Sequence, residues 1–134
     1  SKFVSSTLNN NFIQIYFEEA HMIFPPNAGN TIDVYSRFAN EGAKFNIGIV
    51  YSTQSPSTVN RDLLSQTENF FIGHLSSSID TEQLAKIQQA FHNVGQIIMR
   101  QRTRGLLHVL THSHRYVIPV QANRYNGVSR LAEN

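Results

Sequence analysis

A largely apolar run over residues 12–17 ends abruptly in two adjacent carboxylates, Glu18 and Glu19. A buried strand of an α/β sheet reads as a near-continuous hydrophobic segment, and charge at its end marks where the chain leaves the core. Because ligands of open α/β sheets bind at the carboxyl ends of strands, these acids are candidates to hold a metal beside a nucleotide phosphate. The alternative is a buried strand followed by solvated loop acids.

Two further apolar segments predict buried strands. Residues 45–51 are rich in β-branched side chains and end in a polar cluster with a proline, residues 52–57. Residues 69–75 form the third segment. Residues 25–30 contain two prolines and a glycine, which predicts a loop after the first strand.

Apolar residues at helical spacing separate these strands. Helices are expected over about 32–42, 59–66, from Asp80 or Thr81 to Phe91, and over 94–99. Thr31 is the expected N-cap of the first helix, and Gly42 lies where it would end. Leu84, Ile87 and Phe91 form the expected buried stripe of the third helix.

The C-terminal third predicts a hairpin. After a loop over residues 100–105, strands are expected at 106–110 and 116–120, joined by a tight polar turn at 112–115, with a polar tail over 121–134. The order of elements predicts a single α/β domain, in which helices flank a parallel-core sheet that ends in this antiparallel hairpin.

Glu18, Glu19 and Gln54 each follow a predicted strand. Loops between parallel strands emerge at one edge of the sheet, so we expect these three side chains to lie close together. Glu18 would contact a metal, Glu19 would activate water, and the Gln54 amide would orient water or donate to a phosphate. The chain has no G-x-x-x-x-G-K-[ST] motif, so it does not supply a P-loop phosphate cradle itself.

Four segments carry a resemblance to a known family. They are IYFEEAH (15–21), ANEGAKF (39–45), IVYSTQSPS (49–57) and LLSQTEN (63–69). In this order they resemble the Walker B segment, the A-R-E-G-R-K-F/Y segment, the sensor strand and the L-x-S-Q-x-x-N element of HerA/FtsK-type ATPases. These are RecA-like motors that pump or unwind DNA.

The resemblance implies that residues 1–134 are the C-terminal portion of a RecA-like P-loop ATPase domain whose Walker A portion lies upstream. It implies Walker B roles for Glu18 and Glu19, with Glu19 the catalytic base, and a sensor role for Gln54. ATP and Mg²⁺ would be the cofactors of the intact protein. DNA, a homo-oligomeric ring of six subunits, and a nuclease or other effector would be the partners. The isolated fragment would be inactive.

Two positions depart from the family pattern. Ala43 stands where the family has an arginine that is a candidate to reach a neighbouring subunit's nucleotide, and Ser55 replaces the arginine before the sensor proline. Lys44 or Arg37 would then take the cationic role, although a lysine lacks the planar fork of arginine.

Positive charge is concentrated near the C-terminus, where residues 91–134 carry six arginines and one glutamate. Arg100, Arg102 and Arg104 alternate, so in an extended segment they would face one side and contact nucleic acid or another subunit. A solvated surface is the alternative.

Other functions have weaker signals. The even spacing of His108, His112 and His114 allows a zinc site on one strand face, but no carboxylate lies nearby. A non-catalytic α/β module that holds subunits together is the main alternative to the motor, and a Mg²⁺-dependent phosphohydrolase or nuclease is a third. No cysteine is present, and no apolar run approaches the roughly 20 residues of a membrane span, so a cytoplasmic protein is expected.

Overall fold

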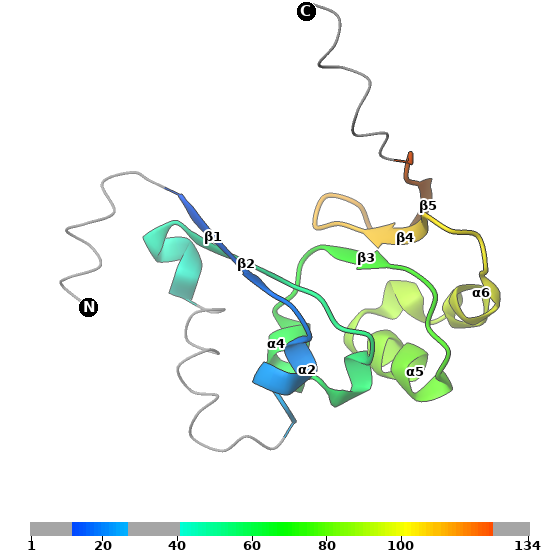
Figure 1. Ribbon diagram of the computed structural model, residues 1–134, viewed down its shortest axis with the longest axis horizontal. Helices are drawn as coiled ribbons and strands as arrows, with labels where there is room; N and C mark the ends of the chain where they lie inside the picture. Colours follow the sequence, from blue (N-terminus) through cyan, green and yellow to red (C-terminus); the bar gives the residue numbers. More distant parts are fainter. Residues whose placement is uncertain (1–11, 27–40, 125–134) are drawn as a thin grey trace, which may run out of the picture.

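Two small sheets and a layer of short helices make up the part of the chain that the computed structural model describes, residues 12–26 and 41–124 (Figure 1). The strands are β1 (Ile13–Phe17), β2 (Ile47–Tyr51), β3 (Phe70–Ile72), β4 (Leu106–Leu110) and β5 (Ile118–Gln121). The α-helices are α2 (Ala20–Ile23), α4 (Arg61–Ser65), α5 (Ser78–Ile87) and α6 (Gly95–Arg100), and the 3-10 helices are η1 (Gly42–Phe45), η2 (Pro56–Thr58) and η3 (Gln89–Phe91).

The first sheet is the parallel pair β1–β2, with Ile13 opposite Ile47 and Phe17 opposite Tyr51. The expected parallel pairing is therefore present. The prediction that β1 is buried is wrong, since Ile13 is 41% and Tyr16 70% exposed. The amino-terminal end of this ribbon extends beyond α2 and α4 (Figure 1), so within the described residues the helices cover only its carboxyl end.

The second sheet has the order β3-β4-β5, and both pairs are antiparallel. The expected C-terminal hairpin is confirmed, and β5 lies at the sheet edge. Its connection covers residues 111–117 and is longer than the predicted tight turn. Gln121 still belongs to β5, so the polar tail does not begin there; residues 125–134 lie outside the described residues.

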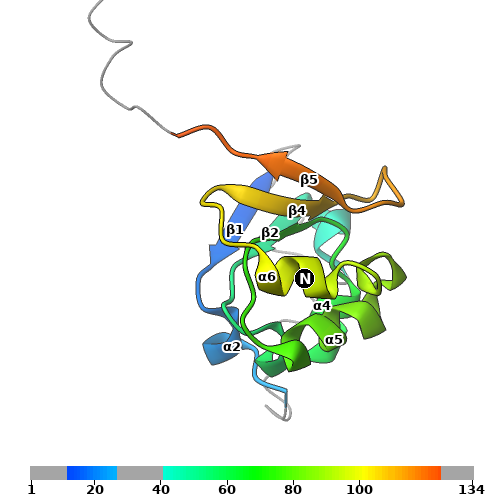
Figure 2. The same cartoon turned by 90° about the vertical axis from the view of Figure 1, so that its right-hand side faces the viewer.

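The strands do not form the expected single sheet with a parallel core within the described residues. The third predicted strand shortens to β3, which pairs with β4, and no ladder joins β2 to β3 there. Figure 2 shows the two sheets as separate ribbons above the helices.

Helix positions agree with the sequence patterns only in part. α5 ends at Ile87, and Phe91 of its expected buried stripe lies in η3. α4 lies within its predicted range, and α6 extends one residue beyond its range, to Arg100. α5 begins at Ser78 after Ser77, so neither Asp80 nor Thr81 is its N-cap. Glu41 is the last α-helical residue before Gly42, where a 3-10 helix begins, so the predicted end of the α-helix at Gly42 is confirmed. Most of the predicted helix over 32–42, with Thr31, lies outside the described residues.

The core consists of two hydrophobic clusters, one under each sheet. The cluster under β3 and β4 contains Phe70, Leu75, Leu84, Phe91, Ile98 and Leu110. The cluster at the carboxyl end of β1 and β2 contains Ala20, Phe24, Val59, Leu63 and Leu64, with Phe17, Tyr51 and Ile87 packed against it. Edge-to-face pairs of Phe17 with Phe24 and of Phe70 with Phe91 stabilise the two clusters. α5 contributes Leu84 to the first cluster and Ile87 to the second, so both sheets pack against the same helix.

Candidate active site

The site lies where β1 and β2 end. The Ser52 amide donates to the Phe17 carbonyl over 2.9 Å, and the Ala20 amide donates to the Ser52 carbonyl over 2.8 Å. These two bonds continue the ladder past both strands. They hold the acidic segment after β1 against the polar segment after β2.

Gln54 and Glu19 contact each other directly at this edge. Gln54 Nε2 donates to Glu19 Oε1 over 2.9 Å. The two side chains come from segments 35 residues apart in sequence, and the expectation that they lie close together is confirmed. Glu18 is exposed at the end of β1, next to Glu19.

Glu19 has a left-handed backbone conformation, with φ 50° and ψ 54°. This region costs a residue with a Cβ roughly 1–2 kcal/mol and is maintained only where the surroundings enforce it. Glu19 precedes α2, whose first turn is closed by the Met22 amide donating to the Glu19 carbonyl over 2.8 Å. Strain at this residue is typical of functional sites.

His21 is next to the second oxygen of the Glu19 carboxylate. Its Nδ1 is 3.4 Å from Glu19 Oε2 and 3.4 Å from Thr53 Oγ1. The Glu19 side chain is 48% exposed and that of His21 30% exposed, so solvent reaches this group. These distances place His21 beside the acids as a hydrogen-bonding neighbour.

Asp80 supports the loop that follows Gln54, a role that the sequence reading missed. This carboxylate is only 5% exposed. Asp80 Oδ1 accepts from the Ser57 amide over 2.8 Å and from Ser55 Oγ over 3.2 Å. The sequence predicted Asp80 only as a possible helix cap. Its contact with the loop joins residues that are distant in sequence, so it could not be predicted from local patterns.

The LLSQTEN segment (63–69) forms a hydrogen bond with Tyr51, the last residue of β2. The Thr67 hydroxyl donates to the Leu63 carbonyl over 3.0 Å, so the Tyr51 hydroxyl donates to Thr67 Oγ1. Burial raises the pKa of the Tyr51 phenol above its ordinary value of 10.0, and the hydrogen bond with Thr67 lowers it in part. Asn60 caps α4 by accepting from the Asp62 and Leu63 amides.

Lys44, one of the two predicted cationic residues, lies away from this site. Lys44 is exposed in η1, before β2 begins, whereas Gln54 follows its end. The five residues of β2, at about 3.3 Å each, separate the two ends. Arg37 and the neighbouring Tyr35 and Phe38 lie outside the described residues.

The three alternating arginines do not share one extended segment. Arg100 ends α6, whereas Arg102 and Arg104 lie in the following loop, and all three are exposed. Arg102 Nη1 is 3.1 Å from His74 Nε2, and His74 Nδ1 is 3.3 Å from the Ile98 carbonyl. His74 therefore donates to Ile98 and accepts from Arg102, and the arginine lies just past the end of β3.

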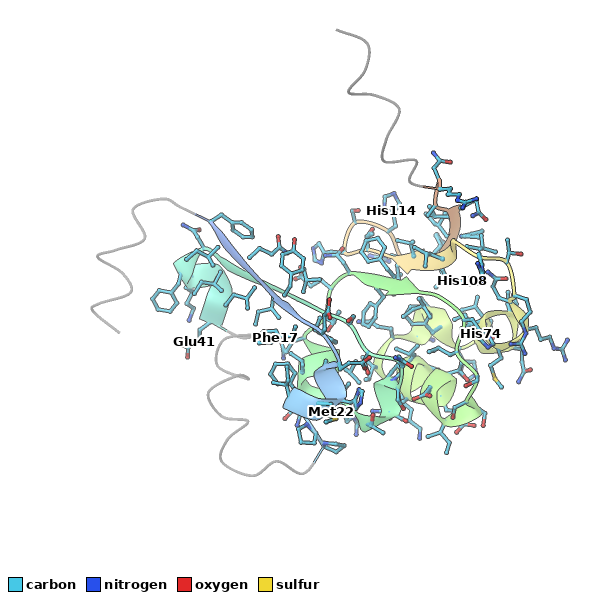
Figure 3. The ribbon with its side chains drawn as sticks, in the orientation of Figure 1. Phe17, Met22, Glu41, His74, His108 and His114 are labelled. Carbon is cyan, nitrogen blue, oxygen red and sulfur yellow. The ribbon has the colours of Figure 1, made fainter. Side chains whose placement is uncertain are left out.

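The three-histidine zinc site is not formed. His108 is buried on β4, and His114 lies in the exposed hairpin loop (Figure 3). Among residues 12–26 and 41–124, no group of three or more histidine, aspartate or glutamate side chains is arranged to hold a metal. No helix in those ranges is long and apolar enough to cross a membrane.

Known proteins resemble this chain in both sequence and fold. The chain is 35% identical to the probable helicase MJ1565 of Methanocaldococcus jannaschii over 92 residues, which are 68% of the chain and 17% of that protein. It is 32% identical to the DNA double-strand break repair helicase HerA of Pyrococcus furiosus over 78 residues, 58% of the chain and 14% of the helicase. The chain thus spans less than a fifth of the length of these relatives. No protein-family model matches it.

Solved structures share the fold at low sequence identity. The genome packaging NTPase B204 of Sulfolobus turreted icosahedral virus 2, in complex with AMP, matches 79% of the chain and 50% of its own length, with a TM-score of 0.64 and 11% identity. Its complex with ATP-gammaS matches with a TM-score of 0.65 and 10% identity. In sequence, the chain thus resembles helicases of the HerA type over about two thirds of its length, and in fold it matches half of a packaging NTPase.

Proposed function

We propose that this chain is part of an ATP-hydrolysing motor that moves or unwinds DNA, and that Glu18, Glu19 and Gln54 belong to its catalytic site. The bond from Gln54 to Glu19 carries the proposal, because it unites a strand-end acid and a strand-end amide at one sheet edge. The relatives support a motor, since two of them are named HerA, a DNA double-strand break repair helicase. The packaging NTPase was solved with AMP, ATP-gammaS and AMPPCP, which supports ATP as the nucleotide.

The donor set fits magnesium. Mg²⁺ prefers oxygen ligands and is usually held by one or two carboxylates together with substrate phosphates and waters, without a full cage of protein ligands. The adjacent carboxylates of Glu18 and Glu19 match this pattern, and Glu18 would hold the ion. When bound, the ion would neutralise charge on the phosphates.

Each side chain then has a defined task. Glu19 accepts the proton of the attacking water as general base. Gln54 holds one oxygen of that carboxylate, and its amide is also able to orient water. His21 lies on the other oxygen and limits how the carboxylate turns. A left-handed backbone at Glu19 fixes the direction of its side chain before substrate arrives.

The phosphate cradle must come from outside this chain, so we propose that residues 1–134 form the C-terminal portion of a larger ATPase domain. We also propose that the intact protein works as a homo-oligomeric ring on DNA. Lys44 is compatible with this arrangement, because it is exposed at the opposite end of β2 from Gln54, where it could contact another subunit. A nuclease or other effector partner remains part of the proposal.

The test is Glu19→Gln in the intact protein. Hydrolysis of ATP should be lost while binding of ATP, measured by isothermal titration calorimetry, is retained. Glu82→Gln is the matched control, since Glu82 is an exposed carboxylate on α5, and it should leave turnover unchanged. Turnover retained by Glu19→Gln would refute the assignment of the base. Absence of both binding and hydrolysis in the unmodified protein would favour the non-catalytic module.

A further inference from the structure

The loop over residues 111–117, which joins β4 to β5, forms one wall of a hollow of about 800 Å³. This volume lies within the range of sites that bind small ligands. The opposite wall is made by the end of α4 with the residues after it and by the segment that contains η3. Neither Glu19 nor Gln54 lines the hollow, so it is separate from the candidate active site.

The hairpin loop is held in shape by its own bonds. His114 Nδ1 is 2.9 Å from Ser113 Oγ and 3.2 Å from Thr111 Oγ1, and the His114 amide donates to the Thr111 carbonyl over 3.1 Å. The His112 amide donates to Asn69 Oδ1 over 3.3 Å, which ties the loop to the start of β3. His114 lies on this loop above the sheet (Figure 3). The loop therefore has a defined shape before any partner binds.

Two side chains of this loop have no role in the packing of the described residues. Arg115 and Tyr116 are both exposed and both line the hollow, and the exposed fraction of Tyr116 is 81%. Neither side chain forms a hydrogen bond or an ion pair with any other described residue. Glu68 is a carboxylate that lines the hollow, and it lies 3.9 Å from the His112 ring. The aromatic ring and the guanidinium are therefore available to a partner.

The chemistry of the hollow fits a nucleotide of a nucleic acid strand. Its opposite wall carries the side-chain amides of Gln88, Gln89 and Asn93. An amide both donates and accepts, so it matches the edge of a nucleobase. Tyrosine rings stack on bases, and arginine pairs with phosphate oxygens. The centre of a protein interface is mostly apolar, whereas the exposed residues of this loop are polar or aromatic, which favours nucleic acid over a protein partner.

We propose that this hollow and the hairpin loop bind single-stranded DNA, with one base stacked on Tyr116 and a neighbouring phosphate on Arg115. A single strand fits better than a duplex, because the bases of a duplex are stacked on one another and do not reach a tyrosine ring. The choice of DNA rests on the proposed function, whereas the stacking site rests on the loop itself.

Binding of a short fluorescein-labelled oligo-dT to the intact, nucleotide-free protein, measured by fluorescence anisotropy, tests the stacking. Tyr116→Ala should weaken binding about tenfold or more, since it removes one stacked base. Tyr116→Phe keeps the ring and should bind nearly as well as the unmodified protein. Tyr16→Ala is the matched control, because Tyr16 is also exposed, at 70%, but lies on β1, and it should leave binding unchanged.

The dependence of the affinity on salt tests the phosphate contact. Arg115→Gln should lower the slope of log affinity against log salt concentration by about 0.7, the value for one phosphate contact on a single strand. Arg61→Gln is the matched control, since Arg61 is an exposed arginine at the start of α4 that does not line the hollow, and it should leave the slope unchanged.

The outcomes separate this inference from the proposed function. If the unmodified protein binds the oligonucleotide and Tyr116→Ala binds it equally well, the loop is not the site and the motor assignment stands. If the unmodified protein binds no DNA, both proposals are wrong. Glu19→Gln should bind the oligonucleotide normally whatever its effect on hydrolysis. A change in the mass of the assembly in Tyr116→Ala, measured by light scattering, would make the loop a subunit contact and overturn the inference.

Discussion

The buried carboxylate of Asp80 accepts a hydrogen bond of 2.8 Å from the Ser57 amide, three residues after Gln54. A residue on α5 thus anchors the loop that carries the candidate sensor. Asp80 also accepts from Ser55 Oγ, next to Gln54. The site at the end of β2 therefore depends on a helix that belongs to the other half of the described structure.

Replacement of Asp80 by Ala should lower the free energy of unfolding by about 2–3 kcal/mol, because a buried amide loses a charged acceptor. Asp80→Asn keeps one acceptor oxygen and should cost less. Urea denaturation of the three proteins measures both differences. Glu82→Ala, an exposed carboxylate two residues away on α5, is the control and should change stability little.

The same Asp80→Asn change should lower kcat of the intact ATPase more than it raises KM. The loop from Gln54 to Ser57 would be less well positioned while the nucleotide contacts elsewhere are unchanged. An unaltered kcat would show that Asp80 is needed for folding alone.

Backbone strain at Glu19 predicts a trade of activity for stability. Glycine has no Cβ and adopts positive φ readily, whereas alanine does not. Glu19→Gly should therefore be more stable than Glu19→Ala by about 1 kcal/mol, while both lose hydrolysis. Equal stability of the two variants, measured by urea denaturation, would mean that the left-handed conformation is not maintained.

Because Tyr51 is buried, we expect the stability of the protein to fall at high pH. Burial raises the pKa of the folded phenol above 10.0, so its stabilising contribution is complete below pH 10. As the pH rises further, the unfolded state releases its proton first and stability falls, by at most about 1.4 kcal/mol per pH unit. Tyr51→Phe should be less stable at neutral pH, since it loses the bond to Thr67, and should show a flatter profile above pH 10 in denaturation titrations.

Asn60 predicts a local effect on α4. Its side chain accepts from the Asp62 and Leu63 amides over 2.9 and 3.2 Å. Asn60→Ala should cost about 1 kcal/mol in unfolding free energy, whereas Asn60→Asp keeps the cap and should cost much less. Asn93→Ala, at an exposed turn position, is the reference substitution. A loss in Asn60→Asp as large as in Asn60→Ala would contradict the capping role.

Local patterns in the sequence are sufficient for several elements. The apolar run before Glu18 and the β-branched run before Ser52 form the parallel pair β1–β2, and helical spacing predicted α4. The meeting of Glu19 with Gln54 was also predictable, because parallel strands bring their carboxyl ends to one edge. These features follow from the period of the side chains and the direction of the strands.

Contacts between distant segments were not predictable in this way. The sequence by itself determined which runs become strands and which acids and amide follow them. Only the tertiary structure decided that β3 pairs with β4, that Glu19 takes a left-handed backbone, and that Asp80 holds the loop after Gln54. Strand partners, enforced strain and long-range hydrogen bonds depend on packing between elements, which the periodicity of a single segment does not encode.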